Sequence, residues 1–233
     1  MSLIPVTTHS GLPEERDGLV VLMDKPEGIT SFGVVRDVRR ALGVKKVGHA
    51  GTLDPMATGL LIVLVGRTAT REQDRFMGQE KEYLATIRLG ETTPSFDAET
   101  EVVDRRDASG VSDTQVAAAI TRFTGEILQT PPAYSAIKVG GERLYKKARR
   151  GEDVAVEPRQ VRVDTFEVVG RENADVRVRI VCSKGTYVRS LARDLGEVLG
   201  VGGHLVALRR TRIGGFEVSD ALTPELLSAL AGA

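Results

Sequence analysis

The chain has 233 residues, of which 41% are hydrophobic and 27% charged, and its 32 basic side chains are balanced by 32 acidic ones. No apolar run approaches the roughly 20 residues that a membrane-spanning helix needs, the first residues lack the pattern of a secretory signal, and Cys182, the single cysteine, excludes an internal disulfide. We therefore expect a globular cytoplasmic protein with no membrane partner, at a length that still fits one hydrophobic core.

The balanced net charge is unusual for a nucleic-acid-binding protein, but the charges are unevenly distributed. Basic side chains gather in two stretches, namely Lys138, Arg143, Lys146, Lys147, Arg149 and Arg150, and Arg177, Arg179, Lys184, Arg189, Arg193, Arg209, Arg210 and Arg212. Acidic side chains gather between residues 91 and 113. The pattern predicts a basic and an acidic face, although such runs are also typical of solvated helices and strands.

Residues 1–17 are expected to form a flexible leader before one catalytic domain over residues 18–233. An apolar run from residue 18 to residue 24 predicts a buried strand that Lys25-Pro26 ends. A helix should follow, with Ser31 as its N-cap and Gly43 at its C-terminal end, because the apolar residues between them recur at helical spacing.

The stretch from residue 48 to residue 59 is too rich in glycine, threonine and proline for a regular element, so it predicts a loop before a buried strand at residues 60–65. Residues 83–89 alternate between apolar and polar side chains, as in a half-buried strand. Ser112 and Gln115 form the pattern of a capping box at the start of a helix.

Residues 142–150 resemble a short basic helix, and residues 161–169 and 176–182 alternate as in an antiparallel hairpin. Thr186 is expected to cap the next helix, and two short strands should follow at residues 204–208 and 213–218. A terminal helix begins near Thr223-Pro224. Strands and helices are mixed without a repeating order, which predicts an α+β fold with a central mixed, largely antiparallel sheet flanked by helices and loops.

The most specific stretch is the loop Gly48-His49-Ala50-Gly51-Thr52-Leu53-Asp54-Pro55-Met56-Ala57-Thr58-Gly59. Its glycines permit unusual backbone angles, and its single acidic residue, Asp54, is restrained by the proline that follows it. It lacks the Gly-Lys-Ser/Thr sequence of a phosphate-binding P-loop. An Asp-Pro pair alone is typical of an ordinary turn, so the dipeptide does not decide the function.

The whole loop resembles the catalytic motif of the TruB family of bacterial tRNA pseudouridine synthases. Further matching motifs, in the same order as in the family, are Asp24-Lys25-Pro26-Glu27-Gly28-Ile29-Thr30-Ser31, Lys81-Glu82-Tyr83, Pro131-Pro132-Ala133-Tyr134-Ser135-Ala136-Ile137-Lys138, Cys182-Ser183-Lys184-Gly185-Thr186-Tyr187-Val188-Arg189 and Leu208-Arg209-Arg210. The resemblance covers roughly residues 18–230. It implies the pseudouridine synthase fold and isomerisation of the uridine at position 55 in the T-loop of tRNA.

By this resemblance, Asp54 is the catalytic carboxylate, acting on the sugar or base covalently or removing a sugar proton. Arg189 pairs with the carboxylate, and Tyr83 stacks on the target base. His49 fills the space that the flipped base leaves, and the remaining substrate-binding residues are Tyr187, Leu208, Asp97 and Lys25, of which Lys25 supports the loop. Taken singly, each of these residues would pass for an ordinary core or surface side chain.

The basic residues Arg143, Lys146, Lys147, Arg149 and Arg150 are interpreted as contacts to the RNA backbone. The resemblance implies no cofactor, and His9, His49 and His204 lack the spacing of metal ligands. We expect a monomer that binds the T-arm stem-loop. Many family members carry a further PUA-type RNA-binding domain, for which the chain after Arg210 leaves no room.

Two alternatives remain. The first is a noncatalytic RNA-binding or tRNA-folding protein on the same scaffold. The second is a hydrolase with an aspartate nucleophile, although such enzymes usually need a paired acid and none is evident near the loop.

Overall fold

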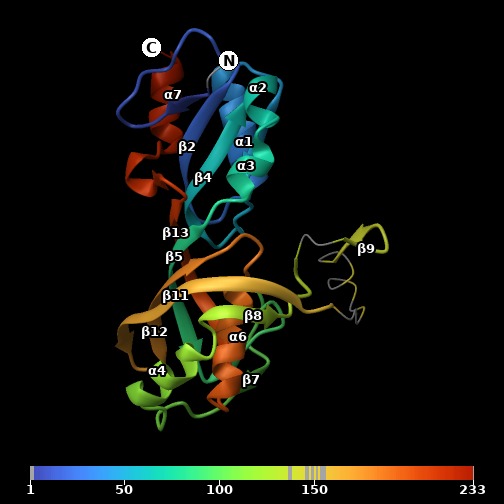
Figure 1. The fold of residues 1–233 in the computed structure, drawn as a ribbon, viewed down its shortest axis with the longest axis vertical. Coiled ribbons are helices and arrows are strands. Elements are labelled where there is room, and N and C mark those ends of the chain that lie inside the picture. The colour runs from blue at the N-terminus through green and yellow to red at the C-terminus, as the bar shows by residue number, and fades with distance from the viewer. Residues whose placement is uncertain are drawn as a thin grey trace. The chain divides into compact units, whose positions relative to one another are not determined.

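The computed structural model describes residues 3–135, 138–144, 147, 150, 152 and 156–232 (Figure 1). The chain forms two compact units. Unit 1 contains Met1–Tyr83 and Leu208–Ala233, and unit 2 contains Leu84–Ala207. The chain passes from one unit to the other inside two strands, β5 (Lys81–Leu89) and β13 (Gly203–Ile213).

The other elements of unit 1 are β1 (Ile4–Val6), β2 (Leu19–Lys25), α1 (Ser31–Leu42), β3 (Val47–Ala50), β4 (Thr58–Val65), α2 (Gly66–Thr70), α3 (Gln73–Met77), β14 (Phe216–Glu217), the 3₁₀ turn η1 (Val218–Asp220) and α7 (Pro224–Gly232). Those of unit 2 are β6 (Glu91–Thr92), β7 (Asp104–Arg105), α4 (Asp113–Thr121), β8 (Gly125–Gln129), β9 (Lys138–Val139), β10 (Glu142–Arg143), β11 (Arg159–Glu172), β12 (Asp175–Cys182) and α6 (Val188–Val198).

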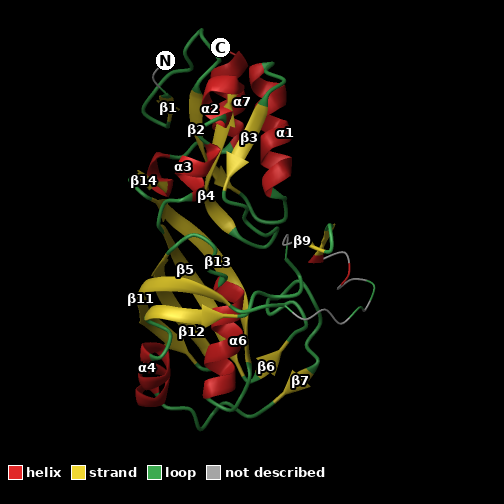
Figure 2. Cartoon of the chain, turned by 45° about the vertical axis from the view of Figure 1, so that its right-hand side comes forward, coloured by secondary structure: helices red, strands yellow, loops and turns green. Residues whose placement is uncertain are grey.

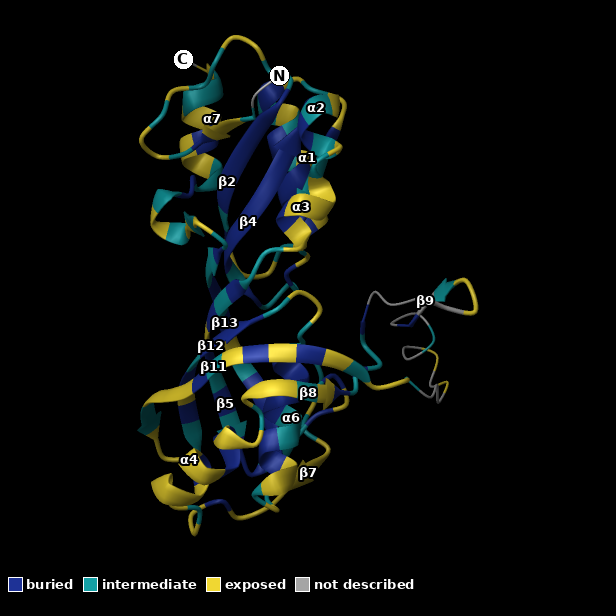
Figure 3. Ribbon diagram, in the orientation of Figure 1, coloured by how far each residue is buried: buried dark blue, intermediate teal, exposed yellow. Residues whose placement is uncertain are grey.

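The core of unit 1 is built around β2 and β4, which pair antiparallel along their whole length. Both strands are almost continuously apolar, and Figure 3 shows them buried over most of their length. Alternate side chains face opposite sides of a strand. Val21 therefore packs in the cluster that contains α1 and α7, and Val20 packs in the cluster that contains Phe76 and Ile213. Because helices cover both faces of these strands, side chains on both faces are buried, and the strand sequences are therefore runs of apolar residues.

The first strand, β1, pairs parallel with β2, and its residue Val6 is fully buried. The expectation of a flexible leader is therefore wrong for residues 4–6. The Ile4 N–H donates to the Gly18 carbonyl on the β2 side. Because successive amides of a strand point to opposite sides, the nitrogen of Pro5 faces away from β2, on the edge where proline is tolerated.

Helix α1 ends at Gly43, as predicted, and Gly43 adopts the left-handed conformation with a φ of 66°. Its N-cap, however, is Thr30, whose side chain accepts a hydrogen bond from Gly33 N–H, so the prediction of Ser31 is wrong by one residue. The expected loop also contains regular structure, because β3 pairs with β4 from Val47 to Ala50. Figure 2 shows α1 alongside β3.

Unit 2 contains the strand order β5-β12-β11-β8, and β11 pairs antiparallel with both β12 and β8. The β11–β12 hairpin and the capping box of α4 are confirmed. The prediction that Thr186 caps the next helix is wrong, because α6 has no side-chain cap. The two strands expected at residues 204–208 and 213–218 are present with other bounds, since β13 continues to Ile213 and β14 begins at Phe216. Of the helix expected at residues 142–150, Glu142–Arg143 is a strand, whereas Leu144 and Lys147 are helical. The predicted α+β class with a mixed, largely antiparallel sheet is confirmed, since parallel pairs occur beside the antiparallel ones.

Candidate active site

The residues expected at the site are divided between the units. Lys25, His49, Asp54, Tyr83 and Leu208 lie in unit 1, and Asp97, Arg143, Lys147, Arg150, Tyr187 and Arg189 lie in unit 2. Lys146 and Arg149 lie outside the described residues, as does the side chain of Arg143.

Asp54 begins a tight turn between β3 and β4. Its carbonyl accepts a hydrogen bond from Ala57 N–H at 3.1 Å, and Pro55 occupies the second position of the turn, where its fixed φ is favourable. The Asp54 side chain is half-buried, so its carboxylate is neither fully solvated nor sealed in the core. The Asp-Pro sequence therefore does form a turn, and the surrounding contacts determine what this turn can do.

Two groups from the Asp24–Ser31 motif bind the carbonyl of Pro55. The Lys25 ammonium donates to Pro55 O at 3.1 Å as well as to the carbonyls of Pro26 and Ile29, and Gly28 N–H donates to Pro55 O at 2.9 Å. Lys25 has no solvent-exposed surface. A buried ammonium stays charged only where oxygen atoms replace its water, so these carbonyls fix both the lysine and the turn.

Ser31 binds the residue that precedes Asp54. Its hydroxyl accepts from Leu53 N–H at 2.8 Å and donates to Leu53 O at 2.9 Å. Both side chains are buried, which means that no water can replace either bond. The first turn of α1 is thereby tied to the backbone immediately before the candidate catalytic carboxylate.

Arg210 holds the two ends of the glycine-rich loop from β13. Its guanidinium donates to Leu60 O at 2.7 Å and to Gly51 O at 2.9 Å, and the side chain is 1% exposed. The backbone also approaches closely: a Cβ on Gly59 would lie 2.2 Å from the Arg210 carbonyl oxygen. Gly59, at a φ of 100°, is thus required both by its conformation and by its neighbour.

His49 lies on β3, next to this arginine. Burial lowers the pKa of its imidazole below the ordinary value, and the positive charge of Arg210 lowers it further. The ring is therefore neutral at physiological pH, and a neutral ring is the form suited to packing against bases.

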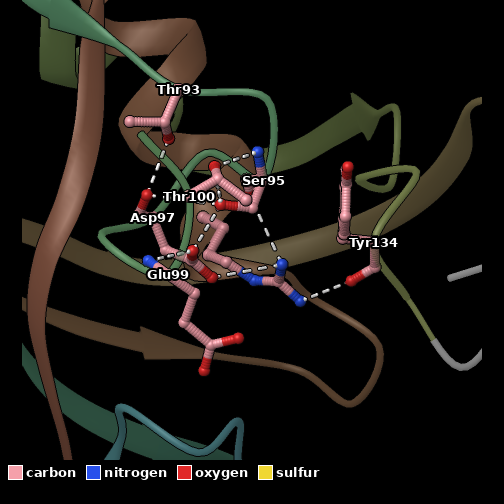
Figure 4. Close-up of polar contacts among 7 residues, drawn as sticks. Thr93, Ser95, Asp97, Glu99, Thr100 and Tyr134 are labelled. Atoms are coloured by element: carbon pink, nitrogen blue, oxygen red, sulfur yellow. Dashed lines mark hydrogen bonds and ion pairs between the residues drawn. The ribbon is translucent and has the colours of Figure 1, made fainter. Parts of the chain in front are cut away.

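Arg189, in the first turn of α6, is buried in unit 2 with its guanidinium bonded to backbone and carboxylate oxygens. Figure 4 labels its partners Ser95, Asp97 and Tyr134. Arg189 donates to the carbonyls of Ser95 at 3.1 Å and Tyr134 at 2.9 Å, and its Nη1 lies 3.3 Å from Oδ2 of Asp97. In turn, Asp97 Oδ1 accepts from the Ser95 hydroxyl at 2.5 Å and from Glu99 N–H at 2.9 Å. Asp97 is completely buried. Its carboxylate therefore acts on Arg189, and a direct contact between Asp97 and a flipped base would require a rearrangement.

The backbone at the start of α6 is held by a buried amide. Gln129, which is fully buried at the end of β8, donates to Tyr187 O at 3.1 Å and accepts from Tyr187 N–H at 2.8 Å. The Ser190 hydroxyl donates to Thr130 O at 2.8 Å. Arg189 lies between these two attachments. The Tyr187 ring itself is half-buried and carries the Arg159 guanidinium 4.8 Å from its centroid.

Two further expected residues, Tyr83 and Leu208, are buried in strands β5 and β13. Of the expected phosphate contacts, Arg150 is exposed but already bonded to both Glu142 and Glu152, which raises its pKa further. It would have to exchange these carboxylates for phosphate.

Sequence reasoning missed Ser31, Arg210 and Gln129 as positioning residues. All three are buried polar side chains bonded to backbone groups far away in the sequence. Ser31 and Arg210 carried a signal as members of the Asp24–Ser31 and Leu208-Arg209-Arg210 motifs, whereas Gln129 belongs to none of the matching motifs. Within the described part of the chain, no cluster of three metal-ligating side chains occurs, and no helix is long and apolar enough to cross a membrane.

Two family models together match most of the chain. The N-terminal domain of the TruB family pseudouridylate synthases matches residues 39–188, and the C-terminal domain of tRNA pseudouridylate synthase B matches residues 189–232. The chain belongs to the TruB family. It is a pseudouridine synthase by family, and the motifs that suggested this relationship lie at the two sets of contacts described above.

Curated TruB relatives align along almost the whole chain. A tRNA pseudouridine synthase B of Mycobacterium sp. (strain KMS) is 51% identical over 215 residues, covering 91% of this chain and 72% of the relative. One from Cutibacterium acnes is 52% identical over 218 residues, covering 88% and 74%.

Solved structures confirm the pseudouridine synthase fold. A chain of a Cbf5-Nop10-Gar1 complex aligns with a TM-score of 0.68 at 33% identity, covering 88% of this chain and 51% of that one. A chain of the archaeal box H/ACA sRNP Nop10-Cbf5 complex aligns with a TM-score of 0.66 at 27% identity, covering 96% and 61%. The present chain therefore spans about half to three fifths of these solved chains.

Proposed function

We propose that this TruB protein isomerises uridine 55 in the T-loop of tRNA to pseudouridine and that Asp54 is its catalytic carboxylate. The observation that carries the proposal is the fixed turn at Asp54: Lys25, Gly28, Ser31 and Arg210 hold the backbone on both sides of one carboxylate. A reaction that needs a single positioned acid is served by such a loop.

The reaction conserves atoms and charge. The bond from ribose C1′ to N1 of uracil breaks, the base turns, C1′ bonds to C5, C5 loses its proton and N1 gains one. No oxidant or energy donor is consumed. Asp54 acts in its ionised form, either as a nucleophile at the sugar or base or as the base that removes a sugar proton. Arg189 supplies the positive charge that favours this ionised form, and Tyr83 stacks on the base.

The substrate partner is the T-arm stem-loop of tRNA, with the target uridine flipped out of its stack. Recognition is mainly of the folded shape, supported by backbone contacts from Arg143, Lys146, Lys147, Arg149 and Arg150. We further propose that the enzyme works as a cytoplasmic monomer without metal or cofactor, and that an isolated T-arm stem-loop is a sufficient substrate.

The test is pseudouridine mapping on an unmodified tRNA transcript incubated with wild-type protein, Asp54→Asn and the control Asp74→Asn, which makes the same chemical change at an exposed aspartate of α3. We expect conversion by the wild type and by the control, and binding without conversion by Asp54→Asn. Binding without conversion by all three proteins would favour a noncatalytic RNA-binding protein. Release of free uracil would favour a hydrolase.

A further inference from the structure

An aromatic ring lies exposed at the start of α1. Phe32 is 61% exposed, and it is the only aromatic residue in the exposed class among the side chains that the structure describes. The buried face of α1 packs through Val34, Val35 and Val38 into the core of unit 1, so Phe32 is not needed to attach the helix. A phenyl ring left in water forgoes the free energy of burial. An exposed ring of this kind is available for stacking against a partner.

The position of Phe32 is fixed relative to the Asp54 turn. The preceding residue, Ser31, forms both hydrogen bonds to Leu53, and Thr30 caps the helix through Gly33 N–H at 3.0 Å. The backbone that carries the exposed ring is therefore one residue from the side chain that holds the residue before Asp54. A partner that covers Phe32 therefore contacts the helix turn that is bonded to the candidate catalytic loop.

Positive charge continues from Phe32 along the same face of α1. Arg36 and Arg40 follow at intervals of four residues, which is roughly 6 Å each along a helix, and both are exposed. Arg40 pairs with Asp37 at 2.9 Å, whereas Arg36 forms no ion pair with any described residue. The first turn of α1 contains no acidic residue, and Glu27, in the loop before the helix, is an exposed acidic residue.

We propose that Phe32 and Arg36 form an RNA contact of the enzyme: the Phe32 ring stacks on an unpaired nucleotide beside the flipped uridine, and Arg36 binds an adjacent phosphate. The inference rests on the proposed function. Flipping one base removes a stacking partner from its neighbours, and an aromatic side chain replaces that partner without regard to sequence. An unstacked nucleotide offers a base for stacking and a phosphate for ion pairing. The exposed ring and the guanidinium one turn later match these two groups.

The chain contains no tryptophan, so one introduced residue gives an unambiguous fluorescence signal. We would place Phe32→Trp in the Asp54→Asn protein and titrate it with an unmodified T-arm stem-loop, following binding separately by the anisotropy of labelled RNA. The matched control is Leu226→Trp, at a 48% exposed position of α7 in the same unit. We expect RNA to quench the emission of the tryptophan at position 32 along the binding curve and to leave that of the control unchanged.

Affinity provides the second test. Phe32→Ala should weaken binding of the stem-loop roughly 5- to 150-fold, the range for loss of one base-stacking contact, while Phe32→Tyr should keep most of the affinity. Arg36→Gln should reduce the slope of log Kd against log salt by about 1.

Binding of RNA without quenching at position 32, or unchanged affinity of Phe32→Ala, while the wild type still converts the stem-loop, would overturn this inference and leave the proposed function standing. Failure of the wild type to bind or convert RNA would remove both. Loss of a dimer on Phe32→Ala, with RNA affinity unchanged, would make this face an interface between two copies.

Discussion

The link from Ser31 to Leu53 gives a sharp test of how the fold positions Asp54. Ser31→Ala removes both hydrogen bonds and leaves the buried N–H and C=O of Leu53 without that partner. Each unpaired buried group costs about 1–3 kcal/mol, so the free energy of unfolding should fall by roughly 2–6 kcal/mol for the two groups together. A carboxylate displaced by a fraction of an ångström should lower kcat about 10- to 100-fold, with a small change in RNA affinity.

The control is Thr30→Ala, which removes the cap of the same helix without touching Leu53. It should cost about 1 kcal/mol of stability and leave kcat little changed. Urea unfolding and single-turnover pseudouridine formation on the T-arm stem-loop provide the two readouts. If Ser31→Ala loses stability but turns over at the rate of Thr30→Ala, the tie to Leu53 stabilises the fold without positioning the carboxylate, and the reasoning is refuted.

Three further substitutions test the contacts around the two sets of site residues. Asp97→Asn removes the fully buried negative charge that pairs with Arg189. The free energy of unfolding, measured with urea, should fall by up to about 3–5 kcal/mol. A fall of less than about 1 kcal/mol, the value of an exposed ion pair, would contradict the buried pairing. Arg210→Met should raise the pKa of His49 toward 6.5, which an NMR titration of the three histidines would detect. Since folded His49 resists protonation, the wild type loses stability as the pH falls below 6.5, and the variant should lose less. Gly59→Ala should prevent folding, because its Cβ would meet the Arg210 carbonyl at 2.2 Å, whereas Gly28→Ala, also at a positive φ but in open space, should still fold, as circular dichroism would show.

Local patterns in the sequence predicted most elements of the fold. The alternation in residues 83–89, the capping box at Ser112 and the hairpin after residue 159 depend on neighbours in the chain, and all three are present. Errors occurred where two local solutions were equally good. Thr30 and Ser31 are both residue types that can cap a helix. In the structure the Ser31 hydroxyl binds the distant backbone of Leu53, and Thr30 caps α1.

The candidate site was predictable as a set of motifs, but its supporting contacts were not. Lys25 was expected to support the loop, and its ammonium donates a hydrogen bond to the carbonyl of Pro55, the residue after Asp54. The roles of Arg210 and Gln129 depend on pairs 159 and 58 residues apart, which spacing in the sequence does not reveal. The roles of Asp54, Tyr83 and Arg189 in catalysis stay predictions.

The proline in β1 has a consequence for solubility. Among the described strands, β1 pairs only with β2, so its other edge would be available to another chain, but Pro5 offers no N–H there. The strand behind β1 is β2, which is apolar from Leu19 to Met23 and whose freed edge would carry unpaired amides. Residues 4–6 thus protect the edge of β2, and their own outer edge lacks the N–H donor that another strand would need at Pro5. Removing the residues before β2 would expose the unpaired backbone amides of β2. We expect folded molecules of the shortened protein to self-associate by pairing these strand edges.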